Sequence, residues 1–382
     1  AFVEGKLSYD VDLYQEDGPK ERDWQVRRGE TWLHFADIED SGVSLQVGRQ
    51  NFQDKREWWW DEDLDGARAY YEWSDFDAEL ALTHDLGRDD FTAEGTNPAV
   101  RQVLFLLGRA SWHWDDRNQI DFFLVHRNDH SKTQRVGDVV SIDREDARDA
   151  ELTWVGVRTR GRQKFRPLGA FYYWGDVGFV FGEETELDFD DLPDERHSEI
   201  EAVSEFDDVR GMGLDLGMTW EPADMPLPRI TLGYAYGSGD RSPTSGSDGT
   251  FRQTGLQDNN GKFRGVNRFR YYGELFRPEL SNLHIVTAGL GIRLLESSSI
   301  ELVYHLYRQD EAVPSLRDSR LKASPEGRRR QLGQEIDLIV GLEEWDWLEI
   351  ELIGSVFRAG SAFGPDEGEL AGLAILNVDF NF

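Results

Sequence analysis

The chain has 382 residues, of which 74 are acidic and 42 basic, and its formal net charge is −32. We expect no nucleic-acid partner, because a surface this acidic repels an anionic phosphate backbone. The chain has no cysteine, which excludes a disulfide framework, a thiol nucleophile and a thiolate metal site. The longest clean apolar run, Val103 to Leu107, is far shorter than the roughly 20 residues of a spanning helix. The chain is therefore either soluble or crosses a membrane as a closed barrel of strands.

Apolar and polar residues alternate from the start of the chain, and this period of two predicts strands. Val3 to Leu13 alternates throughout, and about 9–11 residues is the length of a tilted transmembrane strand. Trp24 to Phe35 predicts a second strand with a bulge, because its apolar parity shifts midway. Val43 to Trp73 predicts a hairpin, and Phe76 to His84 continues it through a tight turn.

The same alternation continues to the last residue. No segment as long as a helix shows apolar residues with a period of 3.6. We count about 16 strands, and outer-membrane barrels have 8 to 26 or more. The further predicted strands are 104–114, 120–126, 152–160, 168–181, 211–220, 229–236, 283–294, 300–306, 336–342, 348–356 and 370–382.

Polar segments without periodicity separate these strands and predict loops. Residues 127–150 are one long loop, and the most acidic segment, 182–208, is read as a solvated loop. A calcium site in the acidic segment is an alternative, although EF-hand spacing is absent. Residues 237–278 predict a loop too long for an ordinary compact domain but normal on the outer side of an outer-membrane barrel. Residues 308–331 form another arginine-rich loop.

The terminal strand has Leu376, Val378, Phe380 and Phe382 on one face, a pattern typical of bacterial outer-membrane barrels. We therefore predict one domain, 1–382, that forms an all-β, transmembrane, antiparallel up-and-down barrel of about 16–18 strands with long extracellular loops. Ala1 is followed directly by strand-like sequence, as expected for a mature chain after signal removal or for a trimmed chain.

Six motifs are spread along nearly the whole chain: VGRQNF (47–52), WWWDEDLDGAR (58–68), YAYGSGD (234–240), RYYGELFRPELSNL (270–283), GQEIDL (333–338) and the terminal NVDFNF. In these motifs the chain resembles the alginate-export family of outer-membrane porins. The resemblance implies a monomeric barrel of about 18 strands whose arginine-rich constriction carries an acidic exopolysaccharide across the outer membrane. The strongly negative net charge departs from that picture, so the positive charge must be concentrated locally inside the pore.

The block of Trp58, Trp59 and Trp60 followed by acidic residues has two interpretations. The family resemblance implies a pore-mouth loop, containing Trp59, Asp61, Asp63 and Asp65, whose carboxylates orient arginines in the lumen. The alternative is a girdle of tryptophans at the membrane interface beside ordinary surface charge.

Most of the basic residues are arginine, whose planar fork suits carboxylate groups, although a GC-rich or salt-adapted source is an alternative explanation. Strand parity places a first set of basic side chains inside the barrel: Lys6, Arg68, Arg109, Arg229 and Arg293. Arg28 belongs with them but lies near the bulge. Arg49 has the same strand parity as the apolar Val47, so its side chain reaches the lumen only if the strand has a bulge or if Arg49 lies at the rim. Arg264 and Arg268, in the long loop, can fold into the mouth. The alternative is that these cations pair with lumen acids, among them Asp10, Asp12, Glu72 and Asp215, and only hold the barrel together.

No enzyme motif of the HExxH or GxSxG type is present, and we predict neither catalysis nor a cofactor or metal. The predicted function is passive passage of an anionic, alginate-like polysaccharide or acidic oligosaccharides across a Gram-negative outer membrane. Membrane lipid, lipopolysaccharide and periplasmic export proteins are the other expected partners. The alternatives are a barrel for adhesion or partner docking, a porin for other small anionic solutes, and a soluble, salt-adapted carbohydrate-binding protein.

Overall fold

The computed structural model describes residues 1–11, 22–84, 103–129, 135–142, 145–192, 196–223, 228–241, 246–321 and 323–380. The described residues form almost only strands, together with the short 3-10 helices η1 (Ile38–Asp40) and η3 (Ser361–Asp366). No helix in this part of the chain has the length and apolarity to cross a membrane. The strands are β1 (Phe2–Val11), β2 (Arg22–Phe35), β3 (Val43–Gln53), β4 (Asp61–Trp73), β5 (Phe76–His84), β6 (Val103–Asp115), β7 (Asn118–Asp129), β8 (Val139–Ser141), β9 (Arg148–Phe165), β10 (Gly169–Asp191), β11 (His197–Glu221), β12 (Arg229–Gly237), β13 (Asn260–Gly261), β14 (Phe269–Arg270), β15 (Leu283–Arg293), β16 (Ser298–Gln309), β17 (Gln331–Trp345), β18 (Leu348–Ala359) and β19 (Leu370–Phe380).

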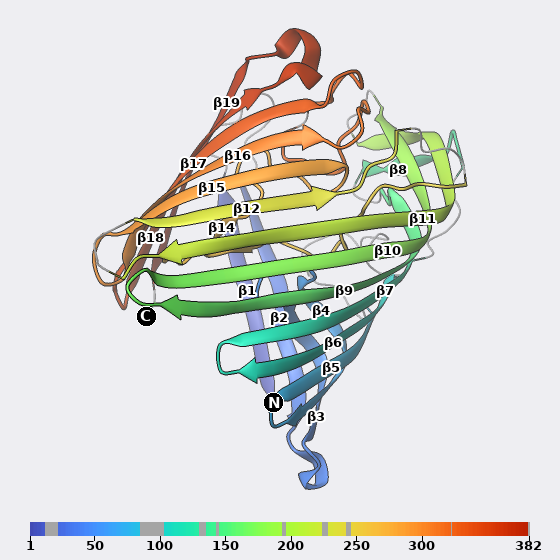
Figure 1. Cartoon of the computed structure of the whole chain (residues 1–382). Coiled ribbons are helices and arrows are strands. Elements are labelled where there is room, and N and C mark those ends of the chain that lie inside the picture. The colour runs from blue at the N-terminus through green and yellow to red at the C-terminus, as the bar shows by residue number, and fades with distance from the viewer. Residues whose placement is uncertain are drawn as a thin grey trace.

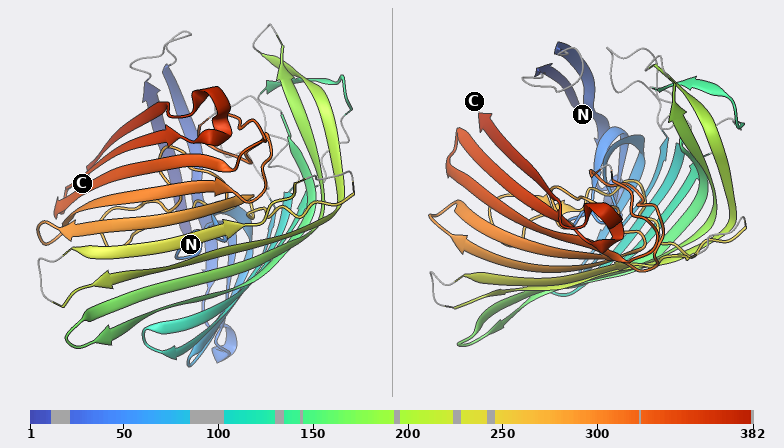
Figure 2. Two further views of the ribbon diagram at one scale, coloured as in Figure 1. Left: turned by 45° about the horizontal axis from the view of Figure 1, so that its top comes forward. Right: turned by 90° about the horizontal axis from the view of Figure 1, so that it is seen from above.

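All the strands except β13 and β14 belong to one 17-stranded sheet, which is antiparallel throughout. The long strands pair with their neighbours in chain order, with β7 joined to β9 and β12 joined to β15, while the short β8 pairs with β11. The sheet curls into a barrel-like trough, and its two edges, β1–β2 and β19, lie on the same open side (Figure 1 and Figure 2). The pairings among the described residues do not join β19 to β1. The predicted all-β, antiparallel architecture is confirmed.

The sheet is apolar outside and polar inside, the reverse of a soluble protein. On β10, Phe179 and Phe181 are exposed, whereas the inward Asp176 is fully buried. On β17, Ile336 and Leu338 are exposed, whereas Asp337 between them is fully buried. This is the alternation expected of a transmembrane barrel, whose outer face meets lipid.

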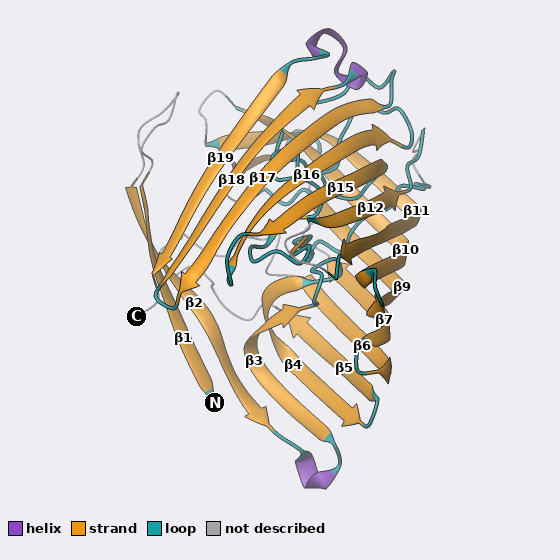
Figure 3. Ribbon diagram, turned by 60° about the vertical axis from the view of Figure 1, so that its left-hand side comes forward, coloured by secondary structure: helices purple, strands orange, loops and turns teal. Residues whose placement is uncertain are grey.

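The connections differ between the two ends of the sheet, which we call the short-turn end and the long-loop end. Short turns join β4 to β5 (74–75), β6 to β7 (116–117) and β17 to β18 (346–347) at one end. Figure 3 shows η1 at this short-turn end and η3 at the opposite end, between β18 and β19. In outer-membrane barrels the short turns are periplasmic and the long loops extracellular.

Two segments at the long-loop end differ from the prediction, and one predicted irregularity is confirmed. The acidic segment 182–208 is not a loop, because β10 and β11 continue through it as one antiparallel hairpin up to Asp191 and Ser198. Its carboxylates alternate with buried residues such as Ile200, so the period of two persists beneath the high charge. Residues 127–150 likewise contain β8 and the beginning of β9. The bulge in β2 is confirmed by the register shift opposite Val3 and Gly5.

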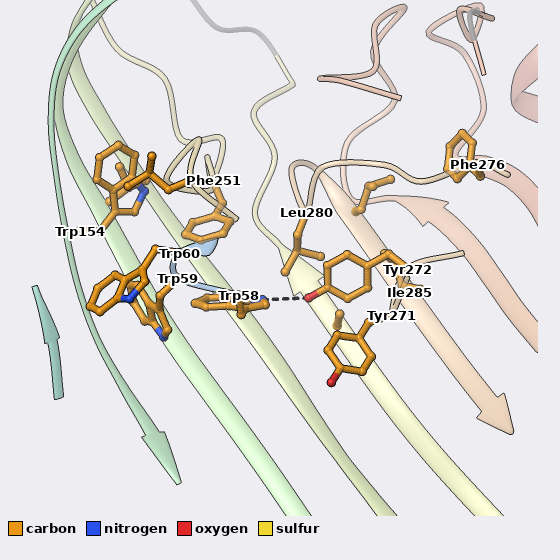
Figure 4. Packing of buried hydrophobic residues seen from close by; sticks show 14 of the residues in the cluster. Trp58, Trp59, Trp60, Trp154, Phe251, Tyr271, Tyr272, Phe276, Leu280 and Ile285 are labelled. Carbon is orange, nitrogen blue, oxygen red and sulfur yellow. Dashed lines mark hydrogen bonds between the residues drawn. The ribbon is translucent and has the colours of Figure 1, made fainter. Parts of the chain in front are cut away.

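The hydrophobic core lies inside the barrel, where two connections from the long-loop end fold inward. We call residues 54–60, between β3 and β4, the inward loop, and residues 246–282, between β12 and β15, the inner loop. Their aromatic side chains pack together and against the inner wall, as Figure 4 shows for Trp58, Phe251 and Tyr272. The inner loop is therefore not an external solvated loop, and it narrows the interior.

Candidate functional site in the barrel interior

The inward loop owes its shape to the side chain of Asp54. One carboxylate oxygen of Asp54 accepts hydrogen bonds from the backbone amides of Trp59 (2.7 Å) and Trp60 (3.4 Å), and the other accepts one from the amide of Arg56 (2.7 Å). The amide of Asp54 in turn donates to the carbonyl of Trp60 at 2.9 Å. These bonds satisfy backbone amides of the loop that take no part in strand pairing, and they hold the loop in one conformation inside the barrel.

The three tryptophans hold the inward loop against the wall and against the inner loop. Trp59 stacks on Phe123 with ring centroids 4.8 Å apart, and its indole nitrogen donates to Asp176 at 3.2 Å. The Trp58 indole donates to the Tyr272 hydroxyl at 2.8 Å, the bond drawn in Figure 4. Trp58, Trp59 and Trp60 are at most 2 % exposed. Their interpretation as a membrane-interface girdle was therefore wrong, because all three point into the barrel.

Buried charges link the same loop to the strands. Arg158 of β9 forms ion pairs with Asp54 and, at 2.6 Å, with Asp176. Although burial alone raises the pKa of Asp54, the Arg158 guanidinium and the loop amides lower it, and the net pKa lies below its usual value. Arg56 pairs with Asp215 at 2.9 Å. Buried ion pairs of this kind cost desolvation, so their main effect is to fix the geometry.

The two inward segments are also joined by charge. Arg268 of the inner loop pairs with Glu57 of the inward loop, and Arg270 pairs with Asp258 within the inner loop. The amide of Asp61 donates to the carbonyl of Leu256 at 2.6 Å. The inward loop and inner loop therefore form one connected body inside the barrel.

The structure places the predicted cations of the first strands next to the predicted carboxylates. Lys6 lies 3.3 Å from Asp63, and Arg28 lies 2.6 Å from Asp65. Asp61, Asp63 and Asp65 belong to strand β4, however, and not to a loop as the sequence predicted. The difference arises because β3 extends to Gln53 and pairs with the acidic segment as far as Asp61.

Arg68 and Arg109 occupy the inner wall of β4 and β6. Both contact Glu79: Arg68 donates to one of its carboxylate oxygens, and Arg109 donates to the other at 3.1 Å. Arg109 also pairs with Asp77 at 2.8 Å. Arg68 lies over the Phe52 ring at 4.8 Å. We call Arg68, Arg109, Glu79 and Asp77 the passage wall: their charges pair with one another, and the two arginine side chains remain partly exposed.

The remaining predicted cations lie in different surroundings. Arg49 is 8 % exposed, and the register of β3 with β2 and β4 is continuous through it, so the predicted bulge is absent, although the preceding Gly48 has φ +128°. Arg229 is buried against Glu301 at 3.5 Å. Arg264 lies over the Tyr172 ring, 4.1 Å from its centroid, and Arg293 is exposed at the end of β15. The predicted cations are therefore distributed around the interior, and six of them have an acidic partner: Lys6, Arg28, Arg68, Arg109, Arg229 and Arg268.

Sequence reasoning missed two groups of interior cations. The side chain of Lys55, in the inward loop, is exposed to the barrel interior, where partial desolvation and the charges of Arg160 and Arg109 lower its pKa. On β9, Arg158, Arg160 and Arg162 occupy alternate positions and share the inward face. The period-two run of arginines in VRTRGRQK was the available signal, but the predicted strand ended at Arg160.

These features define a class of protein. A long-stranded antiparallel sheet with an apolar outer face and a charged, loop-filled interior is the architecture of an outer-membrane β-barrel channel. A family model described as "Alginate export" matches residues 1–375, and the chain belongs to this family. It is an outer-membrane protein.

Known relatives and solved structures agree with this assignment. The chain is 26% identical over 355 residues to "Alginate production protein AlgE" of Pseudomonas aeruginosa, covering 88% of this chain and 70% of that protein. It is 32% identical over 145 residues to the protein of the same name from Azotobacter vinelandii, covering 35% of this chain and 28% of that protein. Acinetobacter baumannii OccAB1 superposes with a TM-score of 0.51 and 9% identity, over 95% of this chain and 76% of that one. P. aeruginosa OccK11 gives 0.50 and 11%, over 98% and 88%. At these identities the structural likeness concerns the fold alone.

Proposed function

We propose that this protein is a passive channel through which an alginate-like, carboxylated polysaccharide crosses the outer membrane. The observation that carries the proposal is the passage wall, where Arg68 and Arg109 share Glu79 inside a barrel of the alginate export family. Guanidinium groups bind carboxylates through paired hydrogen bonds, and a uronate carboxylate presents the same chemistry as Glu79. A carboxylate of the substrate can therefore replace Glu79 as the partner of these arginines, instead of binding an arginine that has no acidic partner.

This sharing of charge suits transport better than tight binding. An ion pair at 4 Å is worth about 4 kcal/mol at an effective dielectric of 20, before desolvation is counted. Conduction requires sites that are favourable enough to enter and weak enough to leave. Because Glu79 already compensates two arginines, each contact with substrate replaces an existing contact and its net free energy is small.

The inward loop and inner loop account for selectivity by size in this proposal. They fill part of the interior and leave cations such as Lys55 and Arg268 exposed towards the remaining space. A flexible polyanion passes in an extended form along these cations, while folded polymers are excluded. The proposal includes a monomeric protein without catalytic activity, whose partners are the polysaccharide and the surrounding lipid and lipopolysaccharide.

Conductance in a planar lipid bilayer tests this function. We expect an open channel with anion preference whose current is blocked by oligouronates and not by neutral oligosaccharides of equal length. A purified, folded protein that gives no conductance, or one that neutral and acidic sugars block equally, would contradict the proposal.

A further inference from the structure

A column of cations runs along the inward face of β9 towards the short-turn end. It consists of Arg158, Arg160, Arg162 and Lys164. Successive members are two residues apart, so their side chains leave the same face about 6.5–7 Å from one another. The pairing of β9 with β10 sets Arg162 directly opposite Tyr172, which places this part of the column beside the short turn at residues 166–168.

Compensation by carboxylates decreases along this column. Arg158 makes two ion pairs and is 1% exposed. The ion pair of Arg160 is long, 3.9 Å to Asp121, and its side chain is 25% exposed. Within the described part of the chain, Arg162 and Lys164 take part in no ion pair. The column is therefore neutralised in the middle of the barrel and carries uncompensated charge at the short-turn end.

The inner loop brings a further arginine to the same place. The Arg264 guanidinium lies 4.1 Å from the centroid of the Tyr172 ring and donates to its hydroxyl at 3.2 Å. The Arg162 guanidinium lies 5.1 Å from the same centroid. The carboxylate of Glu221 also interacts with the Tyr172 hydroxyl. One tyrosine thus orients two guanidinium groups through cation–π contacts.

The backbone of the inner loop is constrained at this position. Arg264 has φ +74°, in the left-handed region that a side chain such as arginine rarely adopts. Such a conformation is unfavourable for a residue with a side chain and persists only where surrounding contacts hold it. Neighbouring contacts do so: Phe263 stacks on Trp174 at 5.6 Å, and the amide of Val266 donates to Ser299 at 3.0 Å. The loop therefore presents Arg264 beside Tyr172 in a defined position.

We propose that Arg162, Lys164 and Arg264, arranged around Tyr172, form a capture subsite for the carboxylates of a polyuronate at the short-turn mouth. The proposal rests on the proposed function and adds a direction to it. Short turns face the periplasm, so the uncompensated cations stand where a chain made inside the cell arrives. They raise the local concentration of a polyanion there, and the paired cations deeper in the barrel hold it less strongly.

The test compares block of the current from the two sides of a bilayer. Because the chain has no cysteine, an Asp40→Cys variant in η1 marks the short-turn end for a membrane-impermeant thiol reagent and so reports the orientation. We expect oligouronates to block faster from the short-turn side. In an Arg162→Gln/Arg264→Gln variant the association rate from this side falls roughly tenfold, while the rate from the other side is unchanged.

An Arg117→Gln variant is the matched control, because it removes an exposed charge from the neighbouring β6–β7 turn at the same end without changing the column on β9 or Arg264. It should keep the asymmetry, and Arg162→Lys/Arg264→Lys should keep most of it. Equal block from both sides of the wild-type channel, or an equal loss in the control, overturns the capture subsite. Absence of block from either side overturns the proposed function itself.

Discussion

Arg158 of β9 and Asp54 of the inward loop are 104 residues apart in sequence and form an ion pair in which both side chains are 1% exposed. This pair joins the barrel wall to the loop that narrows the interior. Because both charges are removed from water, Asp54 depends on Arg158 for compensation, and Arg158 is shared between Asp54 and Asp176. The position of the inward loop therefore depends on the carboxylate of Asp54.

We therefore expect an Asp54→Asn variant to loosen the inward loop. Removing one partner of a buried pair costs up to about 3–5 kcal/mol, because the other charge stays buried, and here only Asp176 remains to compensate Arg158. Chemical unfolding in detergent should show this loss, and single-channel recordings should show a larger, noisier conductance. Asp63→Asn is the matched control, since its pair with Lys6 is half-exposed and such pairs contribute about 0–1 kcal/mol. Equal effects of the two variants would contradict the proposed anchoring.

The same pair gives a pH dependence with a defined sign. Burial raises the pKa of Asp54, but the Arg158 guanidinium and the backbone amides of Arg56 and Trp59 together outweigh it, so the pKa in the folded protein lies below the ordinary 3.8. A carboxyl whose folded pKa is depressed contributes stability above its unfolded pKa and loses it as the pH falls through the folded pKa. The difference in unfolding free energy between wild type and Asp54→Asn should therefore be constant from neutral pH to about pH 5 and shrink below about pH 4. A difference that grows on acidification would refute this assignment.

The hydroxyl of Tyr272 offers a test of the contact between the two inward segments. It accepts from the Trp58 indole at 2.8 Å and donates to Asp215 at 3.0 Å. A Tyr272→Phe variant leaves both partners buried without this bond and should cost about 1–3 kcal/mol in unfolding free energy. Tyr304→Phe is a suitable control, because its bond to Gln334 is only partly buried. A cost no greater than that of the control would show that the segments are held together by other contacts.

The barrel architecture could be predicted because a strand with two different solvents leaves a period of two in the sequence. The predicted strand at Phe76–His84 has the same bounds as β5, and the bulge of β2 was visible as a change of parity. The acidic hairpin was missed because high charge was taken as a loop signal, although Glu184 and Glu186 are compensated by Arg317 from a distant loop. Local sequence cannot show such a partner.

The candidate site was predictable only in part, for the same reason. Strand parity identified cations such as Arg68 on the polar face, but which carboxylate each one meets depends on neighbouring strands and inward loops. The burial of Trp59 could not be deduced, since a tryptophan beside acids is equally typical of a membrane interface. The capture subsite combines Arg162 of a strand with Arg264 of the inner loop, and their approach is a consequence of the inner loop's fold.

The sharing of Glu79 by Arg68 and Arg109 predicts that removing an acid, and not a base, strengthens the interaction with substrate. A Glu79→Gln variant keeps the shape of the side chain but no longer neutralises the two guanidinium groups. The reversal potential in a salt gradient should shift towards higher anion preference, and oligouronates should block for longer because they no longer compete with an internal carboxylate. Glu301→Gln removes a buried interior acid that pairs with Arg229, away from the passage wall, and should change neither quantity. If Glu79→Gln lowers anion preference, or if both variants act alike, the passage wall is not the site that selects the substrate.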